Sequence, residues 1–265
     1  MIFNARENSV EVNGGRMSYV VFGGGQRTLV IIPGLSLQSI HGYALSLAWM
    51  YRIFAKDYRV YVFDKKDEIE ADCTVSSLAE DLASAMLRLG IDQADVIGIS
   101  QGGMIAQYLA LDHPDLVRKL VLGVTLCRTN DTVRGAVGRW IGYAERGDRS
   151  AFISDMLNSM YSEDYVRKYG RFFPLVEKVV KMNSPKRFIA LAKSCLSCDT
   201  YDRLAELSCP VLVIGGAEDK IVTAAASSEI AERLGCHCHI YEGLGHAAYE
   251  EAKDFNRRVY DFLKA

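Results

Sequence analysis

The sequence lacks any apolar run of the roughly 18 residues that a helix needs to span a membrane. It also lacks an excess of charge of one sign, because 31 lysines and arginines accompany 33 aspartates and glutamates, for a formal net charge of −2. The start, MIFNARENSVEV, has no apolar segment of the kind found in signal peptides. We therefore expect a cytoplasmic protein that binds neither nucleic acid nor membranes.

The seven cysteines are an odd, scattered set, which without a signal peptide predicts free thiols. Cys195 and Cys198 form a C-x-x-C pair, and residues 236–239 read Cys-His-Cys-His. The residues of that second group alternate between the two faces of a predicted strand, so they do not converge on one ion. The sequence accordingly predicts no metal site.

Short apolar runs alternate with helical stretches along much of the chain, after a hairpin formed by residues 9–12 and 17–22. This alternation is typical of an α/β protein with a mostly parallel central sheet flanked by helices. The predicted strands are residues 28–32, 59–63, 95–99, 119–126, 210–214 and 237–241. The predicted helices are residues 44–55, 75–89, 101–111, 224–234 and 248–263.

The alternation is interrupted by a segment, residues 128–205, that contains no strand-like run. We expect an α/β core made of residues 1–127 and 206–265, with residues 128–205 inserted as a helical cap. The segment carries 14 lysines and arginines against 9 aspartates and glutamates. Its predicted helices are residues 132–146, 150–160, 164–182 and 185–198.

A candidate nucleophile lies in the pentapeptide at residues 98–102, Gly-Ile-Ser-Gln-Gly, which fits the G-x-S-x-G pattern. The pentapeptide joins a predicted strand to a predicted helix, so Ser100 should lie on a sharp turn with its hydroxyl at the sheet edge. The N-terminus of the following helix directs N–H groups toward developing negative charge. This context favours Ser100 as a nucleophile over a serine that merely caps a helix.

A serine nucleophile needs a base to remove its proton, and His246 is the best candidate. His246 follows the last predicted strand, and open α/β sheets place their sites at the carboxyl ends of their strands. His41 lies in the loop after residues 28–32 and could approach a ligand. The other histidines are interpreted as packing or surface residues: His113, His237 and His239.

The imidazole in turn needs an acid that fixes its tautomer. Asp219 follows the predicted strand 210–214, again at a carboxyl end, and its neighbour Glu218 is the main competitor. We favour Asp219. The order Ser…Asp…His is the one found in α/β-hydrolase triads.

Three segments resemble α/β-hydrolase-fold serine hydrolases, such as carboxylesterases, non-haem haloperoxidase-like hydrolases and C–C bond hydrolases. The segments are DVIGISQGGMIAQYLALDHPDLVRKLVL, CPVLVIGGAEDKIV and EGLGHAAYEEAKDF. The resemblance implies that Ser100 is the nucleophile, Asp219 the acid and His246 the base.

The resemblance also implies an oxyanion hole made by the backbone N–H groups of Leu35 and Gln101. Many relatives have His-Gly after the third strand, whereas this chain has Pro33-Gly34. Both donor positions keep an N–H group, so the departure affects the support of the loop and not the donors themselves.

Together these features predict a serine hydrolase that cleaves a small-molecule ester through an acyl-enzyme and needs no cofactor. A C–C bond or amide hydrolase with the same triad is the alternative, and a non-catalytic ligand receptor on the same fold is less favoured. If the basic residues of segment 128–205 face the site, esters with a remote carboxylate should be preferred. If they face solvent instead, no such preference is expected.

Overall fold

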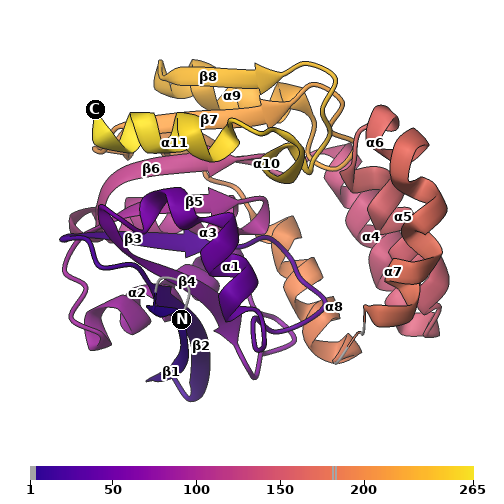
Figure 1. Cartoon of the computed structure of the whole chain (residues 1–265), viewed down its shortest axis with the longest axis horizontal. Coiled ribbons are helices and arrows are strands. Elements are labelled where there is room, and N and C mark those ends of the chain that lie inside the picture. The colour runs from indigo at the N-terminus through magenta and orange to yellow at the C-terminus, as the bar shows by residue number, and fades with distance from the viewer. Residues whose placement is uncertain (1–3, 181, 183) are drawn as a thin grey trace.

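The strands join into one sheet in the order β1-β2-β4-β3-β5-β6-β7-β8 (Figure 1). This computed structural model describes residues 4–180, 182 and 184–265. β1 pairs antiparallel with β2 and β2 with β4, whereas the pairs from β4 to β8 are parallel. The predicted, mostly parallel sheet is therefore confirmed. The strands are β1 (Arg6–Val12), β2 (Gly15–Phe22), β3 (Arg27–Ile32), β4 (Tyr58–Lys66), β5 (Ala94–Ile99), β6 (Val117–Gly123), β7 (Val211–Gly216) and β8 (His237–Tyr241).

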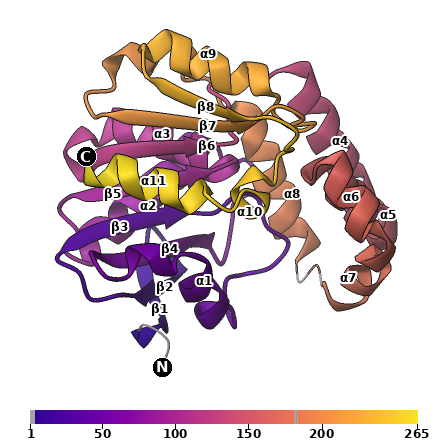
Figure 2. The same cartoon turned by 45° about the horizontal axis from the view of Figure 1, so that its top comes forward.

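Helices cover both faces of the sheet, as Figure 2 shows. Residues of α2, α3 and α9 join one buried apolar cluster, and residues of α1, α10 and α11 join a second. Because both faces are covered, β5 and β7 are buried along their whole length and need apolar or small residues throughout. The helices of the core are α1 (Ala44–Met50), α2 (Val75–Arg88), α3 (Gln101–Asp112), α9 (Ala224–Leu234), α10 (Ala248–Glu251) and α11 (Phe255–Lys264).

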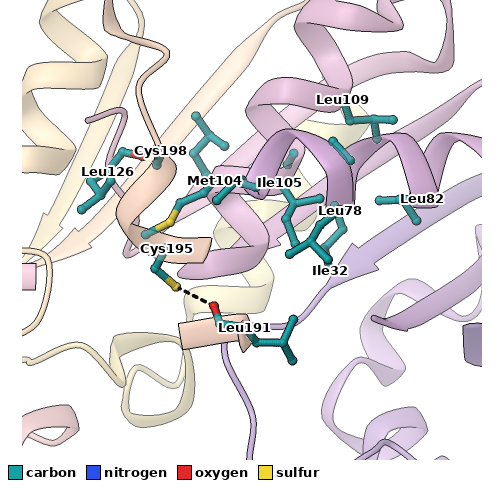
Figure 3. Close-up of a cluster of buried hydrophobic side chains, with 14 of the residues drawn as sticks. Ile32, Leu78, Leu82, Met104, Ile105, Leu109, Leu126, Leu191, Cys195 and Cys198 are labelled. Atoms are coloured by element: carbon teal, nitrogen blue, oxygen red, sulfur yellow. Dashed lines mark hydrogen bonds between the residues drawn. The ribbon is translucent and has the colours of Figure 1, made fainter. Parts of the chain in front are cut away.

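The first apolar cluster continues from the sheet into the helical segment (Figure 3). Met104 of α3 lies in this cluster together with Leu191 and Cys195, which follow β6 by many residues in the sequence. The Cys195 thiol donates to the carbonyl oxygen of Leu191. Residues 128–205 thus share their buried surface with α3, the helix that begins directly after Ser100.

Segment 128–205 is helical and lies beyond one end of the strands (Figures 1 and 2). Its helices are α4 (Asp131–Arg146), α5 (Arg149–Met160), α6 (Glu163–Tyr169), α7 (Phe173–Val179) and α8 (Pro185–Ser194). The single helix predicted over residues 164–182 is wrong, because a 3-10 turn at Gly170–Phe172 separates α6 from α7. Pro174 lies in the first turn of α7 and has no N–H group to continue the hydrogen bonding of a helix that comes from α6. Residue 181 lies outside the described residues.

Other boundaries differ from the sequence prediction for local reasons. β6 ends at Gly123 and not at residue 126, because Val124 takes a positive φ of 45°. The predicted last helix is divided into α10 and α11. The predicted helix over residues 44–55 ends at Met50 and is followed by a 3-10 turn at Arg52–Phe54. β4 runs to Lys66, past the predicted end at residue 63. Among the residues that the structure describes, no helix is long and apolar enough to cross a membrane.

Candidate active site

Ser100 occupies a strained turn between β5 and α3, with φ 55° and ψ −120°. Such a conformation is uncommon for a residue with a side chain. Two hydrogen bonds hold it, because Ser100 N donates to Gly123 O at 2.9 Å and the Thr125 hydroxyl donates to Ser100 O at 2.8 Å. A Cβ at Gly102 would overlap the carbonyl oxygen of Ile32, so only glycine lets α3 approach β3 this closely.

His246 and Asp219 complete a continuous chain of hydrogen bonds with Ser100. The distance from His246 Nε2 to Ser100 Oγ is 2.9 Å, and that from His246 Nδ1 to Asp219 Oδ2 is 2.8 Å. With its proton on Nδ1, the imidazole donates to Asp219 and its Nε2 accepts from the serine hydroxyl. The structure thus brings together the three residues that the sequence analysis selected from distant segments.

The surroundings of Asp219 favour its ionised form, which can stabilise an imidazolium. Its side chain is 1% exposed, and burial alone would raise the pKa of the carboxyl. The charge and hydrogen bond of His246 and the N–H groups of Ile221 and Val222 outweigh burial and hold the pKa of Asp219 below its ordinary value. Asp219 Oδ1 accepts those two N–H groups at 2.8 and 2.9 Å, which leaves Oδ2 to the imidazole. Asp219 is therefore ionised at neutral pH.

The predicted oxyanion donors, the backbone N–H groups of Leu35 and Gln101, belong to two segments that lie close to Ser100. Gln101 is the first residue of α3, and a Cβ built on Gly34 would stand 3.2 Å from Ser100 Cβ. Within the described part of the chain, neither N–H group donates to a protein acceptor. Both donors are thus free to bind an oxygen atom next to Ser100.

A cavity of about 40 Å³ adjoins Ser100 and His246. A wider groove of about 390 Å³ borders it. Leu35, Leu37, Met156 and Met160 line both and therefore stand where the two meet. The other residues that line the inner cavity are Gly34, Trp140, Phe152, Phe188, Ile221 and Tyr249.

The competing candidates lie apart from this chain of hydrogen bonds. Glu218 Oε2 accepts from Glu163 N at 3.4 Å. His41 pairs with Ser18 and Glu7 in β2 and β1, and His113 pairs with Glu80. All seven cysteines are described and are free. In residues 4–180, 182 and 184–265 there is no cluster of three or more histidine, cysteine, aspartate or glutamate side chains able to hold a metal ion.

Sequence reasoning missed the residues that shape the site. Met156 and Met160 are four apart in α5, and this spacing places both on one helix face. Lys65 follows the run RVYVF, and its ammonium donates to the main chain before Leu35. A charged residue at the carboxyl end of a buried strand was the available signal.

Comparison with known proteins shows to which family the chain belongs. The model of the α/β hydrolase fold family matches residues 27–253, and the chain belongs to that family. It is 28% identical to a 2-hydroxy-6-oxononadienedioate/2-hydroxy-6-oxononatrienedioate hydrolase of Paraburkholderia xenovorans, over 94% of this chain and 90% of that one. It is 25% identical to a Rhizobium rhizogenes protein provisionally named carbamate hydrolase RutD, over 90% and 93% of the two chains.

The solved structures show the same fold. MGS-M2, an α/β hydrolase from a Medee basin deep-sea metagenome library, superposes with a TM-score of 0.87. The aligned residues are 21% identical and cover 97% of this chain and 98% of that one. The α/β-hydrolase fold predicted from the three sequence segments is therefore confirmed.

Proposed function

We propose that this protein is a serine hydrolase that cleaves a small, neutral, largely apolar carboxylic ester through an acyl-enzyme on Ser100. One observation carries the proposal. The hydrogen-bond chain Ser100–His246–Asp219 is complete, its imidazole and carboxylate are buried, and Ser100 lies on a strained turn close to two N–H groups that donate to no acceptor in the described residues. Nucleophile, base and orienting acid at these distances define the chemistry of acyl transfer.

In the first half-reaction Ser100 Oγ attacks the ester carbonyl carbon while His246 Nε2 takes the hydroxyl proton. The carbonyl electrons move to oxygen, and the Leu35 and Gln101 N–H groups hold the resulting oxyanion. Asp219 stabilises the imidazolium. The tetrahedral intermediate then expels the alcohol, which receives its proton from His246 and leaves an acyl-enzyme.

In the second half-reaction water replaces the alcohol. His246 Nε2 removes a proton from the water, and the oxygen attacks the acyl carbon. Collapse of the second intermediate returns the proton to Ser100 and releases the carboxylic acid. The chain's own residues perform every proton transfer in this scheme.

The lining of the cavity supports a neutral and apolar substrate. Apart from His246, the residues around the inner cavity are uncharged, and most are aliphatic or aromatic. The basic residues of the proposed cap, residues 128–205, do not line it, and side chains such as Arg139 and Arg167 are exposed and pair with acids. A preference for anionic esters would require these basic side chains to face the site. We therefore do not propose it.

A C–C bond or carbamate hydrolase is the second candidate, favoured by the names of the two relatives. The substrate in the name of the Paraburkholderia enzyme is a dianion. Burying an unpaired carboxylate in this apolar lining would cost several kcal/mol. A neutral ester therefore suits this lining better than a dianionic substrate of a C–C bond hydrolase.

A matched substrate panel tests this assignment. We expect kcat/KM for p-nitrophenyl butyrate to exceed that for mono-p-nitrophenyl succinate by at least about tenfold, or ~1.4 kcal/mol. The two esters have the same chain length and leaving group, and only the succinate carries a carboxylate. p-Nitrophenyl N-ethylcarbamate and a 2-hydroxy-6-oxodienoate complete the panel. Faster turnover of the carbamate than of the butyrate would assign carbamate hydrolysis, and faster turnover of the oxodienoate would assign C–C bond hydrolysis.

The two methionines between cavity and groove should set the size of the accepted group. Met156→Ala or Met160→Ala removes side-chain volume from the junction, so p-nitrophenyl octanoate should gain about tenfold over the acetate in relative kcat/KM. Met50→Ala is the matched control, because Met50 lines the outer groove alone and should leave the ratio unchanged. An unchanged ratio in both α5 variants would show that the acyl chain does not pass this junction.

A further inference from the structure

A buried lysine holds the main chain that leads into the proposed oxyanion hole. Lys65 lies near the carboxyl end of β4 and is 4% exposed. Its Nζ donates to Pro33 O at 2.6 Å and to Gly34 O at 2.8 Å. These are the two carbonyl groups that directly precede Leu35, and they belong to the dipeptide that departs from the His-Gly of many relatives.

The second of these bonds fixes the direction of the Leu35 N–H group. Gly34 O and Leu35 N belong to one peptide unit, which is trans and planar, so its C=O and N–H point in opposite directions. A carbonyl oxygen held toward Lys65 therefore turns the N–H of Leu35 away from Lys65. Gly34 itself packs against Ser100, which places this peptide beside the nucleophile.

We propose that Lys65 is a positioning residue, which holds the turn at residues 33–35 so that the Leu35 N–H stays directed at the oxyanion. This inference rests on the proposed function and adds to it the support of the hole. Lys65 also lines the outer groove, but this role requires no contact between its ammonium and the substrate. Lys65 acts through the peptide whose N–H group faces the oxyanion.

The main chain of Lys65 is fixed on both sides. Its N–H donates to Asp64 Oδ1 at 2.7 Å, and its carbonyl oxygen accepts from Arg187 of α8 at 3.0 Å. Asp64 Oδ2 also accepts from Ile40 N at 3.1 Å, farther along the same loop. The loop after β3 is thus tied to the end of β4 at two places, and the helical segment braces that end.

The charge of Lys65 strengthens the hold. Burial lowers the pKa of Lys65 to about 8 against the opposing effect of Asp64, so the ammonium predominates at neutral pH. The other groups facing it are the Arg187 guanidinium and the Cys195 thiol, whose own burial raises its pKa to about 12. A charged donor makes a stronger hydrogen bond, and a polarised peptide is a better N–H donor at its other end.

The test compares Lys65→Met with Lys66→Met. Lys66 is the neighbouring buried lysine, and its Nζ lies 3.1 Å from Asp81 Oδ2 and does not contact the loop. Lys65→Met should lower kcat for p-nitrophenyl butyrate by about 10²-fold, the scale of losing one oxyanion donor, with KM within twofold. Lys66→Met should lower the melting temperature but keep kcat within twofold.

A trifluoromethyl ketone separates positioning from a general loss of structure. Ser100 Oγ adds to its carbonyl carbon, the hydroxyl proton passes to His246, and the carbonyl oxygen becomes an oxyanion in the hole. Its inhibition constant should rise by the same factor as kcat falls in Lys65→Met. A folded Lys65→Met enzyme with unchanged kcat and inhibition constant would overturn the proposal, and so would a raised KM at unchanged kcat. A wild-type enzyme that the ketone does not inhibit would instead refute the proposed function.

The wild-type enzyme offers a readout that needs no variant. As pH rises through about 8 the ammonium is lost, so kcat should fall on the alkaline side. Two N–H donors remain on the neutral amine, so this fall should be smaller than that of Lys65→Met. A wild-type kcat that is constant from pH 7 to 9.5 would overturn the charge-assisted hold.

Discussion

Replacing Ser100 by alanine should lower kcat for p-nitrophenyl butyrate by about 10⁶-fold, the loss that removal of a triad serine causes in a serine protease. Without the hydroxyl, no acyl-enzyme forms and His246 has no proton to take. The melting temperature should stay close to that of the wild type, because alanine keeps the Cβ and its packing and loses only the hydroxyl that contacts His246. The measurements are steady-state kinetics and thermal unfolding of the two purified proteins.

Ser46→Ala is the matched control for this variant. Ser46 lines the outer groove, and its hydroxyl donates to Tyr43 O at 2.9 Å, away from the imidazole. Its kcat should stay within twofold of the wild type. If Ser100→Ala kept even a tenth of the wild-type kcat while folded, Ser100 would not be the nucleophile.

Replacing Asp219 by asparagine should lower kcat by about 10⁴-fold. The asparagine oxygen can still accept the N–H groups of Ile221 and Val222, so the loop should keep its conformation. Its NH₂ then faces His246 Nδ1 and favours the tautomer with the proton on Nε2. That tautomer cannot take a proton from Ser100.

Glu218→Gln tests the specificity of this effect. Glu218 is the adjacent acid, but its carboxylate accepts from Glu163 N and does not contact His246. The change should leave kcat within about twofold. A larger loss in Glu218→Gln than in Asp219→Asn would assign the acid to position 218.

The site could be predicted from sequence where its residues follow strands that are visible as apolar runs. Ser100 and Asp219 each follow such a run, His246 follows the last strand, HCHIY, and parallel strands bring these positions to one edge. The choice of Asp219 over Glu218 rested on the resemblance and on position, and the 2.8 Å contact with His246 agrees with it.

Residues whose role depends on packing between distant segments could not be predicted. The bonds from Lys65 to Pro33 and Gly34 join the end of β4 to the loop after β3, more than 30 residues earlier in the chain. The net charge of segment 128–205 does not predict which way its basic side chains point. The structure places Arg139 and Arg167 at the surface. The break between α6 and α7 had a visible signal in Pro174, which helical periodicity alone does not register.

The most direct test of the central claim is labelling with a fluorophosphonate, followed by intact-mass and peptide-mass measurement. The reagent phosphonylates a serine oxygen that an adjacent base activates, and fluoride leaves. The account predicts one adduct per chain, on the peptide that contains Ser100, and no adduct in Ser100→Ala. An unlabelled wild-type chain, or a wild-type adduct on any other residue, would contradict it.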